Sequence, residues 1–263
     1  MDAIPRKPLA ADAPLDIDFQ ALPLARLQDM EAAAFEVIES YRSLAAAGAT
    51  VTGEVLKGQG PFVQWDHYPA GDVYDWSSHS QYYYHAHPPD HRGNEWGEEH
   101  GHFHTFLRAQ GMPADARPAD VPGAAAAAGC DESLSHIVAI SMSREGLPVR
   151  LFTTNRWVTG EQWYDAETII GMIDRFKIES AVPSRAVNNW ITGMLRLFRP
   201  QIEMLLRRRD AALKDWQARH ATAALSAYDD RDLEVASVTA IAVDGHIDAL
   251  ATALQARCGG VPS

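Results

Sequence analysis

The order of its periodic segments limits this 263-residue chain to few folds, because helix-like patterns lie at both ends and strand-like patterns lie between them. Apolar side chains recur every three or four residues over 22–47, which predicts a first helix there. Further helices are predicted after Asp165, which can cap one, from 184 towards 220, and near 247–256.

The middle of the chain holds short segments rich in β-branched and aromatic residues, which predict strands. A tight turn is predicted at Pro69–Gly71, and the "REGL" segment predicts a hairpin turn. Because these strands are grouped, we predict an α+β fold with a central antiparallel β-sheet flanked by an N-terminal helix and C-terminal helices. The predicted strands cover residues 50–56, 62–68, 81–87, 100–107, 136–143, 148–158 and 233–243.

A single domain over residues 1–263 is expected, with a loose N-terminal arm at 1–20 and a Pro/Ala-rich loop at 111–130. The two cysteines form no CxxC pattern, which fits a reducing compartment. No apolar leader and no run of about 18 apolar residues occurs, so we expect a cytoplasmic protein without a membrane contact. The net charge of −12 argues against nucleic-acid binding.

Six of the eleven histidines lie between Tyr82 and Phe106, in "YYYHAHPPDHRGNEWGEEHGHFHTF". If both flanking segments are strands, His85 and His87 share one face, and His100, His102 and His104 share one face. Pairing of His85 with His102 would bring these rings onto the same side of the sheet. A slip of one residue would separate them, and the sequence alone does not decide the register.

Imidazole is the commonest protein ligand for borderline transition metals, and three ligands with an open position are typical of catalytic sites. The candidate ligands are therefore His85, His87, His102 and His104, with His100 as an alternate. Glu98 or Glu99 is a candidate ligand or general base. One transition-metal ion is expected, with iron preferred and zinc, copper or manganese as alternatives.

The histidines could instead stack on the neighbouring aromatic rings and make ordinary hydrogen bonds. His67 is compatible with either interpretation, and His136 stands apart and is expected to be structural. Tyr83 is a candidate proton or hydrogen-bond donor to substrate. Asn155 and Arg156 are candidates for binding an anionic substrate group, although Arg156 could equally pair with Glu161.

The segments "YYHAH", "EHGHFH" and "NRWVTGE" resemble an uncharacterised bacterial protein family. The resemblance covers about Val51 to Ile241 and implies no role for any residue, because that family has no known activity.

These patterns predict a metal-dependent enzyme acting on a small molecule, most simply a non-haem oxidoreductase or oxygenase. A non-catalytic metal buffer, sensor or delivery protein is one alternative. A metal-free interaction scaffold is the other, and it predicts an exposed apolar stripe on 187–213 with histidines that face apart. The sequence is compatible with a homodimer.

Overall fold

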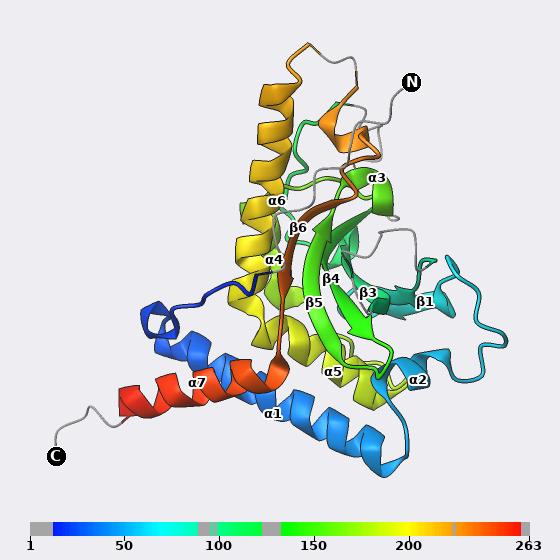
Figure 1. Cartoon of the computed structure of the whole chain (residues 1–263), viewed down its shortest axis with the longest axis vertical. Helices are drawn as coiled ribbons and strands as arrows, with labels where there is room; N and C mark the ends of the chain where they lie inside the picture. The colour runs from blue at the N-terminus through cyan, green and yellow to red at the C-terminus, as the bar shows by residue number, and fades with distance from the viewer. Residues whose placement is uncertain (1–12, 89–95, 97–98, 123–132, 223–224, 259–263) are drawn as a thin grey trace.

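The computed structural model describes residues 13–88, 96, 99–122, 133–222 and 225–258. Its centre is one six-stranded antiparallel sheet in which each strand pairs with the next along the chain (Figure 1). The strands are β1 (Tyr68–Asp75), β2 (Ser80–His85), β3 (Glu99–Arg108), β4 (Leu134–Ser143), β5 (Pro148–Thr154) and β6 (Val235–Ala240). This order confirms the predicted antiparallel sheet.

The α-helices lie before β1 and after β5, with β6 between the last two of them, and this grouping of strands and helices confirms the α+β class. Single-turn 3-10 helices occur at Phe19–Ala21, Ala109–Gly111, Ile173–Arg175 and Ala227–Asp229. The α-helices are α1 (Leu24–Ala46), α2 (Val51–Leu56), α3 (Arg156–Thr159), α4 (Ala166–Met172), α5 (Arg185–Leu197), α6 (Arg199–Arg219) and α7 (Val243–Cys258). No helix of the described residues is long and apolar enough to cross a bilayer.

The long helices pack on one face of the sheet, and this face carries the main core. Phe103 of β3 contacts Trp190 of α5, with ring centroids 5.8 Å apart. The Tyr82 hydroxyl donates to Asn188 Oδ1 of α5 at 2.6 Å, and Ser237 of β6 donates to the Leu205 carbonyl of α6. Because side chains alternate along a strand, His85 of β2 and His102 and His104 of β3 lie on the opposite face.

The C-terminal helices bury the apolar residues that the scaffold alternative would leave exposed. Val187, Trp190 and Ile191 of α5 are fully buried, as are Leu205 and Leu206 of α6. The α4 helix starts as predicted, since the Asp165 side chain accepts from the Thr168 N–H at 2.8 Å. The apolar stripe on 187–213 therefore belongs to this chain's own core.

Two predicted strands are wrong. Residues 51–56 form α2 because the Thr50 hydroxyl accepts from the Gly53 N–H at 3.0 Å and starts a helix. Residues 62–67 lie in the segment before β1 rather than in a strand. The predicted turn at Pro69–Gly71 is an irregularity inside β1, where the pairing register shifts between Tyr68 and Val73.

Residues 13–20, predicted as part of a loose N-terminal arm, pack against the rest of the protein. Leu15 is buried and its N–H donates to the Thr239 hydroxyl of β6 at 2.9 Å, and a 3-10 turn follows at Phe19–Ala21. Residues 1–12 of the arm lie outside the described residues. In the predicted loop at 111–130, the described part from 112 to 122 holds no helix or strand, and 123–130 lie outside the described residues.

Candidate metal centre

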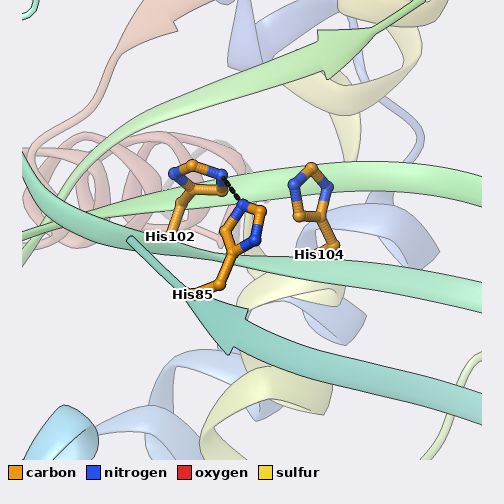
Figure 2. Close-up of side chains that lie close together, drawn as sticks. All are labelled: His85, His102 and His104. Carbon is orange, nitrogen blue, oxygen red and sulfur yellow. Dashed lines mark hydrogen bonds between the residues drawn. The ribbon is translucent and has the colours of Figure 1, made fainter. Parts of the chain in front are cut away.

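Three buried imidazoles converge on the face of the sheet opposite the helices (Figure 2). His85 ends β2 and lies directly opposite His102 of β3, and His104 follows on the same face two residues later. One nitrogen from each ring lies within 4.8 Å of the others, and the His85 and His102 Nε2 atoms are 2.7 Å apart. The register that the metal hypothesis requires is therefore confirmed, and the rings do not face apart.

His87 lies beside these three rings, just beyond the end of β2. Its ring centroid is 4.8 Å from that of His85 and 5.1 Å from that of His102. The half-exposed Trp65 stacks on it at 4.3 Å, and His87 Nδ1 lies 3.9 Å from Glu234 Oε1. His87 is thus a neighbour of the convergent set and is placed between that set and Trp65.

The expectation that His100 shares a face with His102 and His104 is wrong. The β3–β4 ladder contains a bulge between Glu99 and Gly101, so one extra residue of β3 breaks the alternation. His100 consequently turns to the helix-covered side, where its Nδ1 hydrogen-bonds the Tyr84 hydroxyl at 2.6 Å. Its burial lowers its pKa, and it lies outside the convergent set.

The same bulge turns Glu99 towards the histidines. Glu99 Oε1 lies 2.9 Å from His102 Nδ1, and its other oxygen accepts from the Ser141 hydroxyl of β4. A carboxylate in this position fixes the ring and leaves Nε2 to bind a metal, as outer-shell carboxylates do in many metal sites. Glu99 is thus placed to orient a ligand, whereas Glu98 lies outside the described residues.

Aromatic rings line the site. Tyr83 of β2 stacks on His67 with centroids 3.6 Å apart, and its ring lies 5.2 Å from that of His104. Burial raises the Tyr83 pKa, so the phenol stays protonated and keeps its capacity to donate. The Asp72 carboxylate lies at 3.0 Å from His67 Nδ1 and orients this imidazole.

His136 of β4, expected to stand apart, contacts the site directly. Its Nε2 lies 3.0 Å from His104 Nδ1, and both rings are buried. Burial and the positive charge of Arg209 lower the His136 pKa to about 3. Sequence reasoning missed this residue because the contact depends on the pairing of β3 with β4, which a strand pattern does not reveal.

Glu161 is a buried carboxyl group behind His136. Its Oε2 accepts from the His136 backbone N–H at 2.7 Å, and its Oε1 accepts from the Thr159 hydroxyl at 3.2 Å. Burial raises its pKa to about 7, and the charge of Arg209 offsets part of that effect. Glu161 therefore bonds to these two groups and not to Arg156. The alternative that Arg156 pairs with Glu161 is wrong.

Asn155 and Arg156 connect the end of β5 to the 3-10 turn at Ala227–Asp229. Asn155 donates to the Ala227 carbonyl at 2.8 Å, and Arg156 pairs with Asp229 at 2.5 Å. Arg156 also donates to the Pro122 carbonyl at 2.9 Å. These contacts are structural, so a substrate-binding role for the two residues stays a prediction that their partners do not support.

A family comparison covers most of the chain. The model of an uncharacterised family, described as "Domain of unknown function (DUF6969)", matches residues 31–241. The chain belongs to this family. The resemblance inferred from its histidine and "NRWVTGE" segments is consistent with that membership, and the matched range contains β1 to β6 and every residue of the candidate centre. No curated protein and no solved structure matches the chain.

Proposed function

We propose that this DUF6969 protein is a metal-dependent enzyme that acts on a small molecule, with His85, His102 and His104 as ligands of one transition-metal ion. The observation that carries the proposal is the convergence of three buried imidazole nitrogens within 4.8 Å of one another. Three protein ligands leave coordination positions for water or substrate, which is the arrangement of catalytic rather than structural sites.

The surroundings of the three rings support this donor set. Glu99 is placed to hold His102 with its Nε2 directed at His85, and such outer-shell carboxylates accompany metal-bound histidines. Each of these ligand positions comes from a paired strand rather than a loop, so the backbone presents the rings at a fixed spacing. Stacking and hydrogen bonding alone would not need one nitrogen of each ring to lie within 4.8 Å of the other two.

A non-haem oxidoreductase or oxygenase is the activity that we favour. A bound redox-active ion would supply the electron-transfer chemistry, and the aromatic rings around it would restrict water. Phe152 lies 5.1 Å from His102, and Phe106 lies 6.1 Å from His104, both measured between ring centroids. Iron is preferred, with copper or manganese as redox-active alternatives. Zinc, which imidazole also suits, has no redox chemistry and would act only as a Lewis acid.

In this proposal the chain's own residues bind and position the substrate. Tyr83 keeps its proton because burial raises its pKa, so it would donate a hydrogen bond to a substrate held beside His104. The same raised pKa makes the phenol a weak acid, which disfavours transfer of its proton to the substrate. Glu99 would orient His102 and act as a base only through that ring.

Metal content tests the proposal. Untagged protein should carry about one equivalent of a transition metal by elemental analysis, and His102→Ala and His104→Ala should each lose it. His100→Ala is the matched control, because His100 lies on the same strand but faces Tyr84. Wild-type protein with less than about a tenth of an equivalent, and no uptake from iron, zinc, copper or manganese, would contradict the proposal.

A non-catalytic metal binder is the second candidate, and His87 is the observation that favours it. Its ring lies close enough to His85 and His102 to become a fourth ligand and close the coordination sphere. Azide or nitric oxide should change the spectrum of the cobalt- or iron-loaded protein if a position is open. No spectral change in the wild type, with a change in His87→Ala, would favour the closed, non-catalytic site.

A further inference from the structure

His136 forms the middle of a buried polar chain that starts at a proposed metal ligand. Its Nε2 lies 3.0 Å from His104 Nδ1, and its Nδ1 lies 3.4 Å from the Thr154 hydroxyl oxygen. His104 and Thr154 are fully buried and His136 is 2% exposed. This series of hydrogen bonds therefore runs from β3 through β4 to β5 between buried side chains.

An irregularity in the sheet aims His136 at His104. Thr105 pairs with Val138 and Phe106 pairs with His136, so Ile137 is an extra residue in β4. Ile137 and Val138 both join the core on the helix-covered side, and the extra residue leaves His136 on the histidine face. Without this bulge, simple alternation from Ala139 would place Ile137 on the histidine face and His136 among the helices.

The β3–β4 ladder thus has two bulges, one on each side of the pair His102 and His104. The first turns Glu99 to His102, and the second turns His136 to His104. Bulges often re-aim a side chain beside a functional site. Each of the two adjacent ligand positions on β3 therefore receives its own partner at Nδ1.

We infer that His136 is a positioning residue that accepts the Nδ1 proton of His104, so that His104 presents the lone pair of Nε2 to the ion. The inference rests on the proposed metal centre. A neutral imidazole has one N–H, so a ring that binds a metal through Nε2 must carry its proton on Nδ1. His136 Nε2 is then the acceptor, and its own Nδ1–H donates to the Thr154 hydroxyl oxygen.

The two ligands on β3 consequently receive different support. His102 is held by a carboxylate, which raises the basicity of the ring that donates to it. His104 is held by an imidazole, which fixes the ring without adding a negative charge. The opposite proton order, in which His136 donates to His104 Nδ1, would leave a proton on His104 Nε2 and block ligation there.

The tautomer of His104 can be measured without metal or substitution. A long-range ¹H–¹⁵N spectrum of metal-free wild-type protein, with the His104 ring assigned, should show the proton on Nδ1. A His104 ring protonated at Nε2 in that spectrum overturns the inference.

Cobalt(II) binding gives a second readout. His136→Leu removes the acceptor and should lower cobalt affinity by about 10- to 100-fold, whereas His136→Gln keeps an acceptor oxygen and should restore most of it. Thr154→Val removes only the last hydrogen bond of the series and should lower cobalt affinity by a smaller factor. This variant keeps the test usable if His136→Leu does not fold. His246→Gln is the matched control, because His246 is a buried histidine bonded to Gln201 and the Leu197 carbonyl.

The outcomes separate the two proposals. His136→Leu protein that binds cobalt as tightly as wild type, or a loss that His136→Gln does not restore, overturns the positioning role alone. Wild-type protein that takes up no cobalt overturns the metal centre itself.

Discussion

Neighbouring residues of β3 serve opposite faces of the sheet. Phe103 is fully buried against Tyr82, Tyr84 and Trp190 on the helix-covered side. His102 and His104, one position away on either side, point to the other face. One short segment therefore supplies both a core residue and two candidate ligands.

Phe103→Ala should lower the free energy of unfolding by about 3–5 kcal/mol, because it leaves a cavity in the core. The loss should be the same in metal-loaded and metal-free protein, since Phe103 faces away from the candidate centre. Urea denaturation of both forms measures it. Metal loss from Phe103→Ala at a urea concentration where it is still folded would show that the two faces are coupled.

Glu161→Gln should alter how stability depends on pH. The folded-state pKa of about 7 lies above the ordinary value of 4.5 for a glutamate side chain, so folding takes up a proton. The stabilisation from the protonated carboxyl is complete below about pH 4.5 and is lost as pH rises through about 7. Glutamine stays neutral at every pH. The free energy of unfolding of Glu161→Gln relative to that of wild type should therefore rise by up to about 3 kcal/mol between pH 5 and pH 8.

Urea denaturation at several pH values measures this difference. His136 acts in the opposite sense, because its folded-state pKa is lowered to about 3 and its contribution is lost as pH falls. Below about pH 6.5 the contributions of Glu161 and His136 to the pH dependence of the unfolding free energy therefore partly cancel in wild type. The comparison with Glu161→Gln separates the two contributions. The exposed Glu31→Gln is the control and should show the wild-type profile.

At the scale of elements, the close approach of β2 and β3 depends on Gly101. A Cβ atom at this position would lie 2.5 Å from the His85 carbonyl oxygen and 2.6 Å from the Tyr84 hydroxyl oxygen. The His85 carbonyl belongs to a paired strand and cannot move freely. Gly101 thus lies against the backbone of one candidate ligand, His85, and directly precedes another, His102, in the sequence.

Gly101→Ala should therefore destabilise the protein by about 1–3 kcal/mol and also weaken metal binding, because the clash pushes β2 away from β3. Thermal unfolding and cobalt titration measure the two effects. Gly171→Ala in α4 is the matched control, since nothing lies within 4 Å of a Cβ there and alanine favours a helix. Unchanged cobalt affinity in Gly101→Ala would argue that strand spacing does not set the site.

At the scale of the whole molecule, the sheet divides the protein into a helix-covered core and a histidine face. The candidate ligands come from two strands, so a bound ion would tie β2 to β3 in the folded state only. The stability of the whole domain should then depend on metal occupancy.

Removal of the ion with a chelator should lower the melting temperature of wild-type protein. Free metal at about 100 times its dissociation constant contributes about 2.7 kcal/mol by linkage. His104→Ala should melt at the same temperature with and without chelator, whereas His100→Ala should respond like wild type. A chelator that strips metal without changing the wild-type melting temperature would contradict a site that joins the strands.

The sequence by itself determined the grouping of β1 to β5 between helical segments, the β2 and β3 strands, and the concentration of histidines on those two strands. These are local properties, because alternation and helical periodicity are visible within a single segment. The first helix over 22–47 and the cap at Asp165 belong to this class, since neighbouring residues decide them. Residues 51–56 are the exception, where a local Thr50 cap outweighed a β-rich composition.

Only the tertiary structure decided which side chains meet. Pairing of His85 with His102, rather than a register one residue away, brings the rings together. The first bulge of the β3–β4 ladder places Glu99, and not His100, on the histidine face. The second bulge brings His136 into contact with His104. A bulge changes the face of a side chain through one extra residue in a pair of strands, and that mismatch exists only once the partner strand is in place.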